Sequence, residues 1–176
     1  MSKVIAIVNQ KGGVGKTTTA VNLSTVLAQK GKKVLLIYED PQVNATSVLW
    51  IEKNTDKSIY DVLINDTTFE ETIVKTPIKN LFICPSNINL AGAEVELVNK
   101  MSRETKMKEK MEEIQDKFHY IIIDCPPSLG LLTINSLTAA NSIMIPIQCE
   151  YYALEGVGQL MNTVNLIKKQ LNKDLY

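Results

Sequence analysis

The chain has 176 residues, of which 45% are hydrophobic, and this is enough for one domain with its own core but too few for two. Lysine plus arginine and aspartate plus glutamate each total 19, so no overall charge excess indicates a nucleic-acid or membrane partner. Three isolated cysteines with one histidine argue against a metal or redox cluster, and the absence of a signal peptide or a long apolar run predicts a cytosolic protein.

The first predicted element is a strand at 4–8, where five apolar residues follow one another as in a strand buried on both faces. A glycine-rich loop comes next, and an amphipathic helix is predicted over 17–30, with Gly31 placed to cap it. Glycines in such a loop let backbone N–H groups turn inward around an anion. Strand, loop and helix in this order predict a phosphate-binding site.

The loop sequence GGVGKTT at 12–18 fits the P-loop template except that Gln10 stands where the template has its first glycine. Lys16 is expected to place its charge on the outer phosphates, and the Thr17 hydroxyl is expected to bind Mg²⁺. The alternative is a glycine turn that happens to precede a lysine, but the strand before it and the helix after it favour the P-loop. The expected phosphate-binding residues are Gly12, Gly13, Val14, Gly15, Lys16, Thr17 and Thr18.

A second apolar strand is predicted at 33–38, followed by a polar turn at 39–46. The turn contains Asp40 and lies at a strand carboxyl end, where open α/β sheets bind ligands. Asp40 can polarise a water molecule for attack on a phosphate, or it can be an N-cap or Asx-turn residue before Pro41.

Beyond the second strand, strand and helix patterns alternate without repeats or low-complexity segments. Strands are predicted at 81–84, 120–124 and 142–147, and helical patterns at 59–63, 69–74, 90–98, 102–118, 131–140 and 153–171. The alternation predicts an α/β fold with a doubly wound, mostly parallel sheet.

Asp124 closes the apolar strand YIIID, and Pro126 and Pro127 prevent that strand from continuing. An acid at this point is either a turn former or a metal-binding residue. Together with the loop after the first strand, it is expected to orient Mg²⁺ against the bound phosphates.

Five segments resemble the ParA family, and in particular its chromosomal Soj branch. They are NQKGGVGKTTTAVNL at 9–23, EDPQVNAT at 39–46, LAGAEVEL at 90–97, YIIIDCPPSLGLLTINSLTAA at 120–140 and PIQCEYYALEG at 146–156. The resemblance spans nearly the whole chain and implies a P-loop ATPase of the deviant Walker A type.

By this resemblance the protein partitions chromosomes or plasmids, uses ATP and Mg²⁺, and is nucleoid-associated in the cytoplasm. It would bind non-specific DNA as an ATP-bound homodimer, respond to a ParB (Spo0J-type) partner and have no membrane partner. The resemblance implies that Lys11 is the signature lysine that reaches the other subunit's nucleotide and that Lys16 is the P-loop lysine. It also implies that Thr17 is a Mg²⁺ ligand, Asp40 the water-activating acid and Asp124 the Walker B acid.

Three departures from the family pattern bear on hydrolysis and binding. Tyr38 stands where the family has aspartate, and the adjacent Glu39 is expected to point to the other side of the strand. Val43 replaces a family glycine, which strains the turn if it needs a positive φ. The chain stops shortly after the helix at 153–171, so we expect a single ATPase domain over 1–176 without the family's C-terminal part, which supplies the adenine pocket and much of the DNA-binding surface.

The departures leave two alternatives to a hydrolysing partition ATPase. One is a hydrolysis-impaired, truncated regulator that binds nucleotide or a full-length ParA-type partner. The other is a MinD-like membrane ATPase, which the small number of basic residues in the last helix disfavours.

Overall fold

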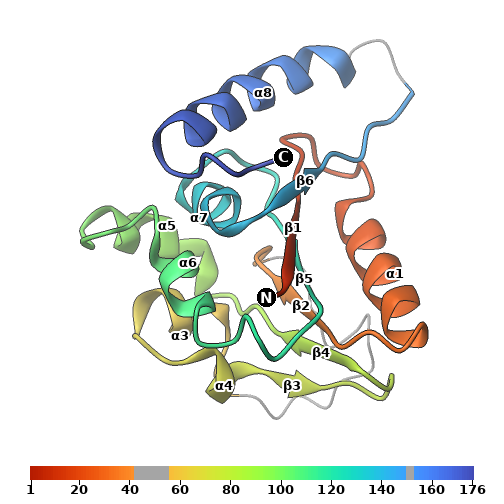
Figure 1. Ribbon diagram of the computed structural model, residues 1–176. Helices are drawn as coiled ribbons and strands as arrows, with labels where there is room; N and C mark the ends of the chain where they lie inside the picture. The colour runs from red at the N-terminus through yellow and green to blue at the C-terminus, as the bar shows by residue number, and fades with distance from the viewer. Residues whose placement is uncertain (42–55, 150–152) are drawn as a thin grey trace.

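A six-stranded sheet forms the centre of the described residues, 1–41, 56–149 and 153–176 of a computed structural model (Figure 1). The strands are ordered β3-β4-β2-β5-β1-β6, and every neighbouring pair is parallel except β3 with β4. Their bounds are β1 Lys3–Ile7, β2 Val34–Tyr38, β3 Val74–Lys75, β4 Leu81–Cys84, β5 Tyr120–Asp124 and β6 Ser142–Met144. This confirms the predicted mostly parallel α/β sheet.

Helices cover both faces of the sheet, as its buried apolar strands require. Among the described helices, α1 packs on one face with a cluster that includes Ile7, Ala20 and Leu36, and the others contribute to a larger cluster on the opposite face (Figure 1). Their bounds are α1 Lys16–Gln29, α3 Ile59–Ile64, α4 Phe69–Thr72, α5 Leu90–Val98, α6 Lys106–Met111, α7 Leu131–Ala139 and α8 Ala153–Gln170.

The strand register gathers the predicted functional residues at one edge of the sheet. Asp124 at the end of β5 pairs with Ile7 of β1 on one side and with Tyr38 of β2 on the other. The loops that follow these three strands therefore leave the sheet side by side. This places the glycine-rich loop, the turn with Asp40 and the end of β5 at a common site.

The elements differ from the sequence prediction at three places. Strand β6 ends at Met144, before Pro146, which cannot donate to a ladder. Val74, which we expected in a helix, instead begins the unpredicted antiparallel edge strand β3. The helix expected over 102–118 is confined to α6, although the apolar residues Met107, Met111, Ile114 and Phe118 of this segment are all buried.

Strand β6 lies at the sheet edge, where its unpaired backbone groups would otherwise face solvent. The main chain of Tyr176 lies beside it: the amide of Ile143 donates to the Tyr176 carbonyl at 2.7 Å, and the Tyr176 amide donates to the Asn141 carbonyl at 3.0 Å. The edge is therefore partly paired by the chain itself.

Candidate functional site

The glycine-rich loop connects β1 to α1 through backbone conformations that need glycine. Gly13 has φ of 70° and Gly15 has φ of 91°, a left-handed region that side chains disfavour. Gly15 is also the N-cap of α1, so the last turn of the loop and the first turn of the helix share this residue. The first amides of α1 thus point into the loop, where they can bind an anion.

A pocket of about 270 Å³ lies inside this loop, at the carboxyl ends of the strands. Its lining combines the loop with Asp40, from the turn after β2, and Pro127, from the segment after β5. Its lining residues are Gly12, Gly13, Gly15, Lys16, Thr17, Thr18, Asp40 and Pro127. The structure thus brings together most of the predicted phosphate-binding residues and Asp40, while Val14 and Lys11 do not line the pocket.

Thr17, which lines this pocket, is in contact with Asp124. The Thr17 hydroxyl donates to Asp124 Oδ2 at 2.6 Å, although the two residues lie 107 positions apart. Burial raises the pKa of Asp124 to about 6, with a further contribution from Asp40 and an opposing one from the Thr17 hydrogen bond. Asp124 Oδ1 is buried and has no hydrogen-bond partner among the described residues.

These oxygens fit a magnesium ion. Mg²⁺ prefers carboxylate and hydroxyl oxygens and takes few ligands from the protein itself. The unpartnered Asp124 Oδ1 and the adjacent Thr17 hydroxyl offer this chemistry next to the phosphate loop. The predicted assignment of Thr17 and Asp124 to one metal site is thus consistent with their contact.

Lys16 lies inside the loop and is only 7% exposed. Its ammonium group donates to the Lys11 carbonyl at 3.1 Å, across the turn of the loop. Burial lowers the pKa of Lys16, while the charges of Asp124 and Asp40 oppose this shift. A buried ammonium group near two carboxyl groups is a suitable counter-ion for the phosphates of a bound nucleotide.

Lys11 is exposed on the outer side of the loop, where its ammonium group donates to Gln148 Oε1 at 3.4 Å. The Gln148 amide group also donates to the Gly13 carbonyl at 3.3 Å. Asn9 completes this bracing, since its side chain accepts from the Lys11 amide at 3.0 Å and donates to the Pro146 carbonyl at 2.8 Å. Neither Asn9 nor Gln148 has a predicted role from the sequence, although both lie within the family-like segments.

Tyr38 and Glu39 point to opposite faces of β2, as expected for neighbours in a strand. Tyr38 is fully buried with the cluster on the α1 side, its hydroxyl has no hydrogen-bond partner among the described residues, and burial raises its pKa. Glu39 is also fully buried but accepts a hydrogen bond from Ser136 of α7. Burial raises the pKa of Glu39 to about 8. The prediction that Glu39 points away from the site of Tyr38 is confirmed.

The turn after β2 is described only in part. Asp40 lies two residues after the end of β2 and lines the pocket, whereas Val43, the expected strained position, lies outside the described residues. Ser136 went unrecognised in the sequence, because a serine inside an apolar helical run gives no local signal of a partner on another element.

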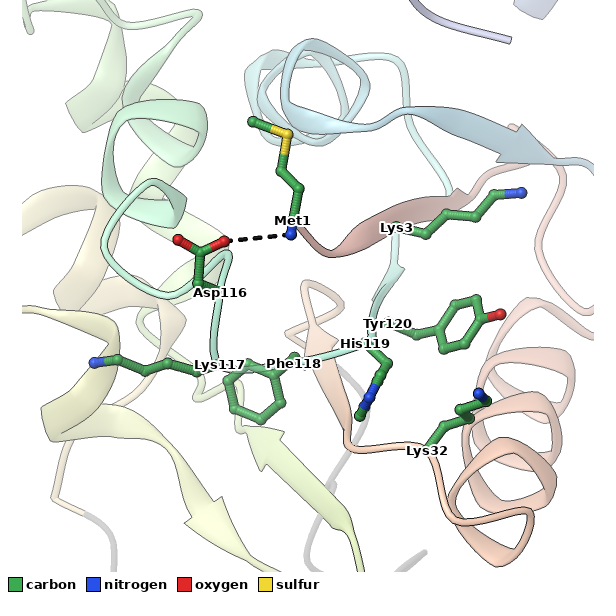
Figure 2. A pocket seen from close by; sticks show the side chains of 8 residues that line it. All are labelled: Met1, Lys3, Lys32, Asp116, Lys117, Phe118, His119 and Tyr120. Atoms are coloured by element: carbon green, nitrogen blue, oxygen red, sulfur yellow. Dashed lines mark ion pairs between the residues drawn. The ribbon is translucent and has the colours of Figure 1, made fainter.

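A second hollow, of about 350 Å³, lies at the amino ends of β1 and β5 (Figure 2). Some of its polar groups are bound within the chain: the Met1 amino group pairs with Asp116 at 3.3 Å, and His119 Nδ1 accepts from the Lys33 amide at 2.9 Å. Lys117, which Figure 2 shows directed away from the hollow, forms an ion pair with Glu70. This hollow is at the opposite end of the strands from the loop pocket and is not part of that site.

Comparison with known proteins gives consistent results. The sequence pattern of a family described as an AAA domain matches residues 2–176. The chain is 58% identical to the sporulation initiation inhibitor protein Soj of Bacillus subtilis, over 99% of this chain and 70% of that protein. It is 50% identical to the chromosome partitioning protein ParA of Myxococcus xanthus, over 99% of this chain and 62% of that protein. The chain thus spans about two thirds of these relatives.

A solved structure is similar at the level of the fold. The cobyrinic acid a,c-diamide synthase from Mycobacterium smegmatis, with bound ADP and magnesium, gives a TM-score of 0.93 at 40% identity, over 99% of this chain and 71% of that one. Within the described part of this chain, no helix is both long and apolar enough to cross a membrane.

Proposed function

This chain belongs to the ParA family of partitioning ATPases, and from that premise we propose that it binds ATP with Mg²⁺ in the loop pocket and hydrolyses it to ADP and phosphate. The observation that carries the proposal is the convergence of Lys16, Thr17 and Asp40 around one pocket, with Asp124 bonded to Thr17. The similar M. smegmatis structure holds ADP and magnesium together, which supports the same pair of ligands here.

Phosphoryl transfer needs positioning and charge neutralisation more than covalent chemistry. The loop amides and Lys16 would hold the phosphate chain, since the loop and the buried Lys16 line the pocket. Thr17 and Asp124 would hold Mg²⁺, which supplies positive charge to the outer phosphates when bound. The buried Asp124 Oδ1, unpartnered in the described residues, would then gain a ligand.

Asp40 is the group we assign to the attacking water. It lines the same pocket as the loop, so its carboxylate can accept a hydrogen bond from a water next to the terminal phosphate. Asp40 follows β2 and Lys16 begins α1, so the two groups reach the pocket from different elements. This arrangement brackets a phosphate between a cation and a base.

We extend the proposal to chromosome or plasmid partitioning through an ATP-dependent homodimer that binds non-specific DNA and a ParB-type partner. The support is family membership and the exposed position of Lys11 at the outer side of the loop. A lysine at this position can reach the nucleotide of a second subunit, which would couple hydrolysis to dimerisation.

A second candidate is a hydrolysis-impaired regulator that binds nucleotide or a complete ParA-type partner. The observation that favours it is Tyr38, a fully buried phenol where the family has a carboxylate. A phenol without a hydrogen-bond partner among the described residues cannot replace a carboxylate beside Mg²⁺. Nucleotide binding without turnover would identify this function.

The deciding experiment measures phosphate release and nucleotide binding with MgATP for the wild type, Lys16→Ala and Lys32→Ala. Lys32 is a matched control because it is an exposed lysine in the second hollow. We expect Lys16→Ala to reduce both signals and Lys32→Ala to change neither. Equal phosphate release from the wild type and Lys16→Ala would reject the hydrolysis proposal, and binding without release would establish the regulator.

A further inference from the structure

Glu39 is held at the carboxyl end of β2 by two hydrogen bonds to different elements. Its amide donates to the Asp124 carbonyl of β5 at 2.9 Å, and its carboxyl group accepts from the Ser136 hydroxyl of α7. Both side chains are fully buried. This strand end is therefore tied to the sheet by its backbone and to the helix layer by its side chain.

A carboxyl group is an unfavourable choice for a fully buried position unless a hydrogen bond compensates for its lost hydration. The Ser136 hydroxyl gives this compensation to one of the two Glu39 carboxyl oxygens, while Oε1 is buried without a hydrogen-bond partner among the described residues. The bond also restricts where the strand end can lie, because a hydrogen bond is directional and an apolar contact is not. The neighbouring Tyr38 fills the opposite face of the sheet with its ring. Two adjacent side chains thus fix the same strand end from both faces.

The residue that follows is Asp40, which lines the loop pocket. An acid that activates water must keep its distance to the reacting phosphate within a narrow range, and small displacements are costly for the rate. We propose that the Glu39–Ser136 hydrogen bond is a clamp that fixes the carboxyl end of β2 on α7 and thereby positions Asp40 over the phosphate loop. Glu39 and Ser136 are then positioning residues, and only the role of Asp40 rests on the proposed function.

The test removes the hydroxyl with Ser136→Ala and compares it with Ser24→Ala. Ser24 is a matched control because it is also a fully buried helical serine, yet its hydroxyl has no partner among the described residues. The first measurement is hydrogen exchange of the Glu39 amide, relative to the Ala6 amide in β1. We expect Ser136→Ala to speed Glu39 exchange by about tenfold over this reference, and Ser24→Ala to leave the ratio unchanged.

The second measurement is steady-state ATP hydrolysis. Ser136→Ala is expected to lower kcat by about tenfold with little change in KM, because the loop and Lys16 are untouched. Glu39→Gln keeps an oxygen acceptor for Ser136 and should retain kcat, whereas Glu39→Leu should match Ser136→Ala. This rescue by the glutamine separates positioning from a general loss of packing.

The outcomes separate this inference from the ATPase proposal. If the wild type releases no phosphate, the hydrolysis proposal is rejected. Hydrogen exchange of the Glu39 amide then tests the clamp by itself. Equal exchange ratios in the wild type and Ser136→Ala overturn the clamp, as does an equal change in Ser24→Ala. Faster exchange with an unchanged kcat in an active enzyme rejects the link to Asp40.

Discussion

The Thr17 hydroxyl, in the lining of the loop pocket, and the Asp124 carboxylate are joined by a hydrogen bond of 2.6 Å. The contact links the first turn of α1 to the end of β5, so the phosphate loop is held in a fixed position relative to β5. Both groups are those proposed to hold Mg²⁺.

Mg²⁺ is expected to increase the affinity of the wild type for ATP. Asp124→Asn should reduce this increase by about tenfold, while the affinity for ATP without metal should change little. The amide can still accept the Thr17 hydrogen bond but carries no charge for the ion. Titration of ATP with and without Mg²⁺ measures the difference. Asp116→Asn is the control, since Asp116 pairs with the chain's amino group at the other end of the strands. A Mg²⁺ effect that persists in Asp124→Asn would remove Asp124 from the metal site.

Gly15→Ala is expected to lower the free energy of unfolding by about 1 kcal/mol, because alanine disfavours the φ of 91° at this position. Nothing lies within 4 Å of a Cβ added there, so the cost is backbone strain and not a clash. Gly12→Ala is the matched control, since its surroundings are equally open and its φ is not positive. Urea unfolding compares the two, and equal stabilities would contradict the strain argument.

Tyr38→Asp is expected to raise phosphate release, because it restores a carboxylate at the position where the family has one. The same change removes a fully buried ring from the cluster on the α1 side and should cost about 3 kcal/mol of stability. Turnover is therefore measured together with the folded fraction. No increase per folded molecule would mean that position 38 does not belong to the site.

Tyr38→Phe separates the hydroxyl from the ring. The Tyr38 hydroxyl is buried with no hydrogen-bond partner in the described residues, so its removal should leave stability unchanged or raise it by about 1 kcal/mol. Phosphate release should stay at the wild-type level. A marked loss of stability in urea would show that the hydroxyl has a partner when the protein is in solution.

Lys11→Ala is expected to leave MgATP binding by one subunit intact and to weaken ATP-dependent dimerisation by about tenfold. Lys11 lies outside the pocket lining, on the exposed side of the loop beside Gln148. Sedimentation with a non-hydrolysable ATP analogue measures the dimer, with Lys3→Ala as the control. Undiminished dimerisation would exclude the proposed contact across subunits.

Much of this protein is determined by the sequence alone. The apolar strands, the loop 12–18 and Asp124 predict a parallel α/β sheet with a phosphate site, because local pattern and glycine conformation are encoded in short segments. Strand ends were less predictable: β6 is shorter than its apolar run and β3 has no distinct signal, because pairing across strands sets their limits.

Only the tertiary structure decided which distant side chains meet. Ser136 meets Glu39 across 97 positions, and Gln148 meets Lys11 across 137, and neither contact can be inferred from spacing along the chain. The alternation of side chains along a strand predicted that Glu39 points away from Tyr38. Only the packing of α7 on the sheet placed the Ser136 hydroxyl against Glu39. Contacts of this kind depend on how layers stack, which a single sequence does not record.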